Sequence, residues 1–163
     1  MAETLKAATD DQVVEIIKWA IAYGKPLEVR GTGSKKALGR ATALEHILDL
    51  SSLTGVNFYE PAELVVSAGA ATSVKQIQML LANHDQHMAF EPPDYGPLFG
   101  QDEGRGTLGG LLASNLAGSR RIKFGSARDH FLGFTAVSGR GEVFKSGGRV
   151  VKNVTGFDLS KLM

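Results

Sequence analysis

Residues 104–115 read Gly-Arg-Gly-Thr-Leu-Gly-Gly-Leu-Leu-Ala-Ser-Asn, a run in which glycines lead into leucines at helical spacing. Leucines recur at positions 108, 111, 112 and 116, which is the spacing of one helix face, and Thr107 is a natural N-cap. The predicted helix, about 108–117, therefore begins among glycines, whose N–H groups no side chain shields. Since a helix N-terminus favours anions, the stretch predicts a phosphate-binding turn. A helix that packs closely on a sheet also requires small residues. A phosphate-binding role and a packing role for the glycines therefore both stay open.

A second glycine-rich stretch, Val29-Arg30-Gly31-Thr32-Gly33-Ser34-Lys35-Lys36, lies nearer the N-terminus. A short predicted strand, 26–30, runs straight into it. Several backbone N–H groups of Gly31 to Ser34 can then converge on an anion, and the Thr32 and Ser34 hydroxyls can add donors. The alternative is an ordinary turn after a strand, with both lysines in solvent.

Two familiar nucleotide motifs do not fit. The letters Gly104-x-Gly106-x-x-Gly109 match the dinucleotide fingerprint, but that motif requires a buried strand directly before it. Phe-Gly-Gln-Asp-Glu at 99–103 cannot be that strand. The phosphate-loop pattern also fails, because no Gly-Lys-Ser/Thr follows Gly31. We therefore do not expect a classical nicotinamide-binding fold.

The remaining elements alternate in type along the first half of the chain. Helical periodicity predicts helices, whose starts are marked by the capping boxes Thr9-Asp10-Asp11-Gln12 and Ser73-Val74-Lys75-Gln76. Short apolar runs between turn signals predict strands. The expected elements are a helix at 11–23, strands at 46–50, 57–60 and 63–69, a helix at 74–84, a loop at 90–106, a hairpin of 131–138 and 141–145, and a strand from 150. This is an α+β arrangement of two lobes, about 1–55 and 56–163, with a glycine-lined crevice between them.

Composition limits the partners. The net charge of +1 gives no reason to expect nucleic acid or an anionic membrane as a general partner. No apolar run is long enough to span a membrane, and the N-terminus lacks the layout of a signal peptide. We therefore expect a cytoplasmic protein. The absence of cysteine excludes cysteinyl cofactor attachment and an iron–sulfur cluster held by thiolates of this chain. His84 and His87 have no third ligand nearby, so no metal site is expected.

The two glycine-rich stretches, in this order and spacing, resemble the FAD-binding domain of the vanillyl-alcohol-oxidase/p-cresol-methylhydroxylase (PCMH) superfamily. Val29–Ser34 resembles its first pyrophosphate loop, and residues 107–119 resemble its second loop and helix. Pro92-Pro93-Asp94 lies where the superfamily has a proline-bearing loop near the flavin. Residues 128–133, 139–142 and 147–162 resemble, more narrowly, the E-subunit family of bacterial glycolate oxidases.

The resemblance implies a two-lobed PCMH-type fold, with a small parallel-strand lobe and a mixed or antiparallel lobe, that holds FAD. Many members attach flavin through a histidine of the first loop, where this chain has Thr32 and Ser34, so FAD is expected to be non-covalent. Arg30 is expected either to touch the cofactor or to pair with Asp129. The expected cofactor-binding residues are Arg30, Gly31, Thr32, Gly33, Ser34, Pro92, Gly106, Thr107, Leu108, Gly109, Gly110, Ser114, Asn115, Gly118, Ser119 and Gly125.

The resemblance also implies an activity, oxidation of a 2-hydroxy acid such as glycolate, beside other subunits that include an iron–sulfur subunit. The chain ends on an apolar segment without a closing signal, so we expect it to belong to a longer protein. The cap domain and the catalytic residues would then lie elsewhere, and this part alone would not turn over substrate. Two alternatives stay open: a non-catalytic flavin-binding or assembly subunit of a dehydrogenase complex, and a phosphate-ligand binder unrelated to flavin.

Overall fold

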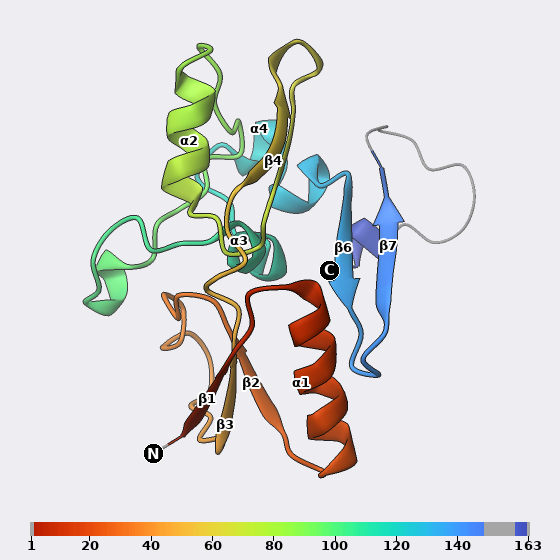
Figure 1. Cartoon of the computed structure of the whole chain (residues 1–163). Coiled ribbons are helices and arrows are strands. Elements are labelled where there is room, and N and C mark those ends of the chain that lie inside the picture. Colours follow the sequence, from red (N-terminus) through yellow and green to blue (C-terminus); the bar gives the residue numbers. More distant parts are fainter. Residues whose placement is uncertain (1, 149–158, 163) are drawn as a thin grey trace.

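A parallel sheet of three strands forms the N-terminal part of the computed structural model, which describes residues 2–148 and 159–162 (Figure 1). Its order is β1 (Glu3–Lys6), β3 (His46–Asp49), β2 (Leu27–Arg30). The central strand places Leu48 between Leu5 and Val29. The expected parallel lobe is therefore confirmed, but the sequence analysis missed β1. This edge strand has one apolar side chain, Leu5, which is too few for an alternating pattern.

Helix α1 (Asp10–Ala22) covers one face of this sheet (Figure 1). Thr9 caps it, because its hydroxyl accepts the Gln12 N–H at 3.3 Å. The Gln12 side chain accepts the N–H of Ala8 at 2.7 Å, so the reciprocal half of the expected capping box is displaced by one residue. The helix and sheet meet in a core of Ala7, Val13 and Leu48, against which Ile16, Ile17, Leu27, Leu50, Leu53 and Val137 pack.

The central part of the chain forms a hairpin, three α-helices and a second core. Strands β4 (Val56–Glu60) and β5 (Val65–Ala68) pair antiparallel, and α2 (Val74–Ala82) follows with Ser73 as its N-cap. After the loop come α3 (Leu108–Ser114) and the single turn α4 (Arg121–Phe124). Helix α3 ends earlier than expected, because Asn115 adopts a left-handed conformation with a φ of 46°. Phe90, Leu111 and Ala127 form the second core.

The expected C-terminal hairpin is confirmed as β6 (Gly133–Val137) and β7 (Val143–Gly147), paired antiparallel. It stands beside α1 (Figure 1), and its Val137 packs into the first core. The division into lobes near residue 55 stays a prediction, since one strand of the expected second lobe contributes to the core of the first. The strand expected from 150, and most of the 147–162 run, lie outside the described residues.

Thr72 joins the ends of the β4–β5 hairpin. Its fully buried hydroxyl accepts the Gly55 N–H at 2.9 Å and donates to the Gly55 carbonyl at 3.1 Å. Thr72→Val keeps the shape but leaves the Gly55 N–H unpaired, while the Gly55 carbonyl still accepts the Gly69 N–H at 2.8 Å. We therefore expect a loss of about 1–3 kcal/mol in unfolding free energy by urea titration. Thr54→Val is the control at an exposed position and should stay within about 0.5 kcal/mol of the unmodified chain. Equal losses in the two variants would contradict this role.

Candidate functional site

The first glycine loop and helix α3 face each other across a cleft of about 320 Å³. The loop and the approach to α3 are joined by two hydrogen bonds. The Thr32 hydroxyl donates to the Arg105 carbonyl at 2.5 Å, and the Arg105 guanidinium donates to the Thr32 carbonyl at 3.0 Å. A Cβ on Gly31 would lie 3.4 Å from the Thr107 Oγ1, so the two segments are in close contact. The structure thus brings together the two stretches that the sequence singled out.

Four consecutive backbone N–H groups of the first loop are available to a ligand. Strand β2 ends at Arg30, whose carbonyl accepts the last ladder hydrogen bond from Leu50 at 2.8 Å. Beyond it, the N–H groups of Gly31, Thr32, Gly33 and Ser34 donate to no other residue in the described part of the chain. All four residues line the cleft. Such a row of donors is suited to the oxygens of a phosphate group, as the sequence predicted.

Three N–H groups of the helix turn that was expected to supply further free donors are already in use. The Leu108 N–H donates to the Thr72 carbonyl at 2.9 Å, and the Gly109 N–H donates to the Ala70 carbonyl at 2.7 Å. The Gly110 N–H donates to the Thr107 hydroxyl at 3.2 Å. These three groups are therefore not free for an anion, which corrects that part of the expectation.

The glycines of α3 serve close packing instead. A Cβ on Gly109 would lie 3.0 Å from both the Cβ and the carbonyl oxygen of Ala70. Gly110 and Ser114 line the cleft together with Thr107. The Ser114 hydroxyl donates to the Gly110 carbonyl at 2.6 Å, so this side chain offers lone pairs rather than a proton. Helix α3 therefore acts as a wall of small residues against which a ligand can lie.

The side chains of Arg30 and Thr32 have other roles in the structure than the sequence analysis expected. Arg30 pairs with Glu28, at 3.8 Å between the charged atoms, so the expected pair with Asp129 is wrong. Asp129 instead accepts the N–H of Ser126 at 2.7 Å and the hydroxyl of Ser126 at 3.0 Å, which lowers the pKa of its carboxyl. The Thr32 hydroxyl is no spare donor, because its proton is held by Arg105. Of the two first-loop hydroxyls, only that of Ser34, a residue that is 6% exposed, is left to a ligand in the cleft.

Like Leu108 and Gly109, four further expected cofactor contacts line neither this cleft nor the cavity at the proline-bearing loop: Asn115, Gly118, Ser119 and Gly125. Their contacts lie within residues 91–129 instead. The Asn115 amide oxygen accepts the Arg128 N–H at 2.9 Å. A Cβ on Gly118 would lie 2.5 Å from the Glu91 carbonyl oxygen, and the Ser119 hydroxyl donates to the Glu91 carboxylate at 3.4 Å. Gly125, with a φ of 77°, lies directly against Asp129. Contact between these four residues and a cofactor stays a prediction.

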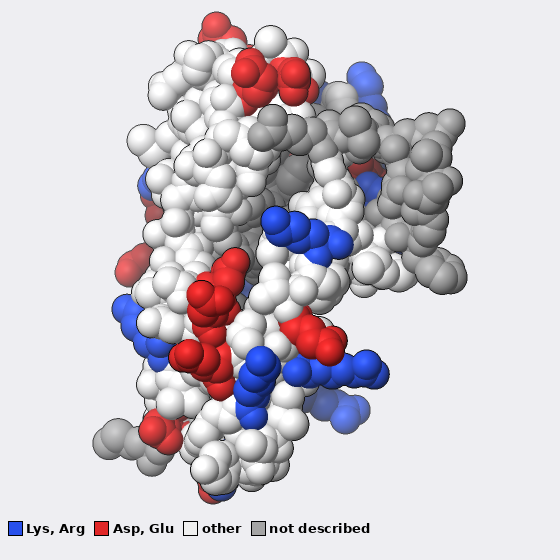
Figure 2. Space-filling view, turned by 45° about the vertical axis from the view of Figure 1, so that its right-hand side comes forward, with Lys and Arg blue, Asp and Glu red and all other residues white. Residues whose placement is uncertain are grey.

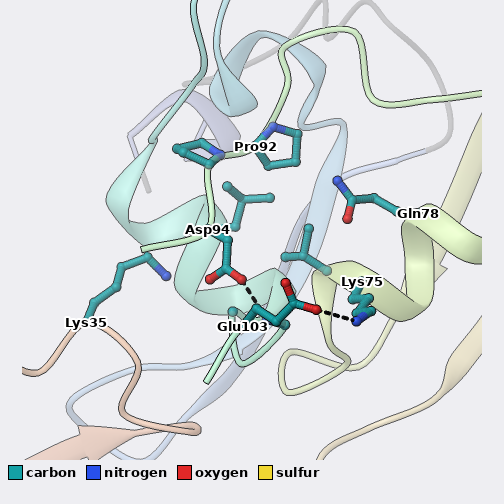
Figure 3. Close-up of a pocket in the computed structure, with 11 residues that line it drawn as sticks. Lys35, Lys75, Gln78, Pro92, Asp94 and Glu103 are labelled. Atoms are coloured by element: carbon teal, nitrogen blue, oxygen red, sulfur yellow. Dashed lines mark hydrogen bonds and ion pairs between the residues drawn. The ribbon is translucent and has the colours of Figure 1, made fainter. Parts of the chain in front are cut away.

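A second cavity, of about 240 Å³, lies between α2 and the proline-bearing loop (Figure 3). Pro92 and Gly106, both expected near the cofactor, line it. The loop is held by Asp94, whose carboxylate accepts the N–H groups of Gly104 at 2.6 Å and Gly96 at 3.0 Å. These hydrogen bonds lower the pKa of the Asp94 carboxyl.

Lys35 is a site residue that the sequence analysis missed. Its side chain points toward Asp94 in Figure 3 and is about half buried, and this burial lowers the pKa of its ammonium while Asp94 opposes the shift. The next residue, Lys36, is exposed and pairs with Glu28 at 3.5 Å. Nothing in two adjacent lysines of a polar loop signals that one turns inward and the other outward.

Comparison with known proteins identifies the family of the chain. Residues 2–147 match the family model described as an FAD binding domain. The chain belongs to this FAD-binding family. It is 38% identical to the glycolate oxidase subunit GlcE of Escherichia coli over 151 residues, which are 93% of the chain and 41% of that relative. It is 28% identical to a D-lactate dehydrogenase of Archaeoglobus fulgidus over 160 residues, which are 98% of the chain and 34% of that relative.

Two solved enzyme structures share the fold. The FAD-binding domain matches 6-hydroxy-D-nicotine oxidase from Arthrobacter nicotinovorans with a TM-score of 0.70 and 16% identity, over 90% of this chain and 31% of that one. It matches alkyldihydroxyacetonephosphate synthase with a TM-score of 0.72 and 16% identity, over 98% of this chain and 28% of that one. The expected PCMH-type fold is thus confirmed. The chain spans about two fifths of the length of GlcE and about a third of the lactate dehydrogenase.

The residues of the cleft fit the cofactor of the family. FAD carries a negatively charged diphosphate, and the cleft presents four unused N–H donors beside a half-buried ammonium. On the face of the domain that Figure 2 shows, acidic and basic side chains both occur, in small groups separated by uncharged surface. Residues 2–148 and 159–162 contain no group of acidic and histidine side chains arranged to hold a metal ion. Within the same ranges, no helix has the length and apolarity to cross a membrane.

Proposed function

We propose that this chain binds FAD non-covalently in the cleft between the first glycine loop and α3, with the diphosphate on the N–H groups of Gly31 to Ser34. The observation that carries the proposal is this row of four unused donors, which lines the cleft of a domain whose family binds FAD. Gly110, Ala113 and Ser114 form the opposite wall and let the ligand lie close to the helix.

Non-covalent binding is proposed because the cleft offers no attachment chemistry. Neither cavity is lined by a histidine among the described residues, and the sequence contains no cysteine. The first-loop positions that could attach a flavin are Thr32 and Ser34, and their hydroxyls are weak nucleophiles without an adjacent base. Flavin should therefore leave the chain when the protein is denatured.

For the longer protein we propose oxidation of a 2-hydroxy acid such as glycolate. Flavin supplies a ring that takes up the two electrons lost when a 2-hydroxy acid becomes a 2-oxo acid. Support comes from the relatives, which carry the names glycolate oxidase subunit and D-lactate dehydrogenase. We also propose that further subunits act beside it, since two of these relatives are named as subunits. On the resemblance described above, we propose that one of these subunits is an iron–sulfur protein and that the assembly lies in the cytoplasm.

Addition of FAD to the purified chain, followed by removal of the excess, tests the first proposal. We expect the visible spectrum of flavin to stay with the protein and to be released into the supernatant after acid precipitation. A colourless protein would refute FAD binding by this chain, and colour that stays in the precipitate would refute non-covalent attachment. Retention of another nucleotide with rejection of FAD would favour a phosphate-ligand binder unrelated to flavin.

Substrate reduction of the complete protein tests the second proposal. Glycolate or D-lactate, added without oxygen, should bleach the visible absorbance of the bound flavin. The subunit names of the relatives also favour a second candidate, a non-catalytic flavin-binding or assembly subunit of a dehydrogenase complex. Flavin that binds but is reduced by neither acid, alone or with the other subunits, would favour that candidate.

A further inference from the structure

Lys35 occupies a position between the cleft at the first loop and the cavity at the proline-bearing loop. Among the described residues it alone lines both the 320 Å³ cleft at the first loop and the 240 Å³ cavity at the proline-bearing loop. Its ammonium lies 3.5 Å from the point where a Cβ on Gly110 would stand, which places the charge against the first turn of α3. A ligand that extends from one cavity into the other must therefore pass this side chain.

The ammonium of Lys35 is attracted by the Asp94 carboxylate, but no direct contact accounts for its burial. It makes neither a hydrogen bond nor an ion pair with another described residue, although the other lysines near the cavities do: Lys36 pairs with Glu28 at 3.5 Å and Lys75 with Glu103 at 3.2 Å. Partial burial of a charge without a partner costs stability. The four unused N–H donors of Gly31 to Ser34 share the cleft with this charge. An unpartnered cation beside unpartnered donors is the environment that a multiply charged anion would complete.

We propose that Lys35 binds the diphosphate of FAD and selects diphosphate-bearing ligands over flavins that lack one, an inference that rests on the proposed function. The backbone donors of the first loop contact phosphate oxygens from one side, and the Lys35 ammonium supplies the neutralising charge where the two cavities meet. The two halves of the ligand then extend into different cavities. Asp94, held by Gly96 and Gly104, keeps the proline-bearing loop in place beside the ammonium.

Lys35→Met tests the inference, with Lys25→Met as the control. Both variants lose one positive charge, but Lys25 is exposed, lines neither cavity and pairs with Glu45 at 3.7 Å. The measurements are the dissociation constants of FAD, ADP and riboflavin, which lacks a diphosphate, by calorimetry, and the melting temperature of each chain without ligand. Because a charge-assisted contact is lost, Lys35→Met should weaken FAD and ADP at least about tenfold and riboflavin by less than about threefold, whereas Lys25→Met should change each by less than about threefold.

The melting temperature separates a binding role from a structural one. Removal of an unpartnered, half-buried ammonium should leave the ligand-free Lys35→Met chain as stable as the unmodified chain or more stable, while FAD raises its melting temperature less. A lower ligand-free melting temperature together with unchanged dissociation constants would make Lys35 a structural residue and overturn the inference. Equal weakening by the two variants would do the same, since it would reflect net charge alone. If the unmodified chain binds neither FAD nor ADP, the proposed function fails and this inference fails with it.

Discussion

A Gly33→Val variant is expected to bind FAD at least about 100-fold more weakly than the unmodified chain while remaining folded. Gly33 has a φ of 72°, in the left-handed region that costs a side-chain-bearing residue about 1–2 kcal/mol and a β-branched residue more. Its Cβ would also lie 3.1 Å from the Arg30 Cδ. The loop is exposed to the cleft and can relieve this strain by rotating its peptides, which turns the N–H groups away from the ligand.

The expected size follows from the donors at risk. Hydrogen bonds to a charged group contribute about 1.5–3 kcal/mol each, so the loss of two of the four donors corresponds to about 3 kcal/mol or more. Since each 1.4 kcal/mol is about tenfold in affinity, the dissociation constant should rise by at least about 100-fold. Calorimetric titration of FAD into the two chains measures the ratio directly.

Gly24→Val is the matched control for backbone strain. Gly24 has a φ of 61°, follows the end of α1 and has no atom within 4 Å of its Cβ position, so the substitution imposes the left-handed penalty without touching the cleft. It should lower the unfolding free energy about as much as Gly33→Val but change the FAD dissociation constant less than about twofold. If Gly33→Val binds FAD as tightly as Gly24→Val does, the first loop is not the diphosphate site.

The sequence predicts helix caps and loops of this domain better than it predicts which backbone N–H groups are already hydrogen-bonded. Caps at Thr9, Ser73 and Thr107 are correct, because each depends on a side chain and a backbone group three residues apart. The free N–H groups of the first loop were also foreseen, since that loop directly follows a strand. The donors of Leu108 and Gly109 were wrongly expected to be free, because their acceptors, Thr72 and Ala70, are more than 35 residues away. No local pattern reveals a partner at that separation.

The same limit explains why the sequence analysis missed the burial of Lys35 and the strand β1. Lys35 and Lys36 are equivalent in the sequence, and only the meeting of the first loop with α3 and the proline-bearing loop buries one of them. Strand β1 exists because β3 offers it an open edge, not because Glu3-Thr4-Leu5-Lys6 favours an extended conformation. Features set by tertiary contact were therefore missed, although the resemblance to an FAD-binding family correctly supplied the overall architecture.

Leu48→Ala is expected to cause the largest loss of stability, about 3–5 kcal/mol in unfolding free energy. Leu48 is 1% exposed and sits on the central strand of the parallel sheet, between Leu5 and Val29. It packs with Ala7 and Val13 in the core under α1, and the neighbouring strands limit how far the structure can close around the cavity. Leu98→Ala, at a leucine that is 71% exposed, should change stability by less than about 0.5 kcal/mol.

Addition of FAD distinguishes the loss of stability in Leu48→Ala from the loss of affinity in Gly33→Val. A ligand that binds only the folded chain stabilises it by about 2.7 kcal/mol at 100 times its dissociation constant. Leu48 lines neither cavity, so excess FAD should raise the urea midpoint of Leu48→Ala about as much as that of the unmodified chain. The same FAD concentration should raise the midpoint of Gly33→Val very little, because its affinity is lost. If FAD stabilises Gly33→Val and not Leu48→Ala, the cofactor is held by the sheet core rather than by the glycine loop, and the assignment of the site is wrong.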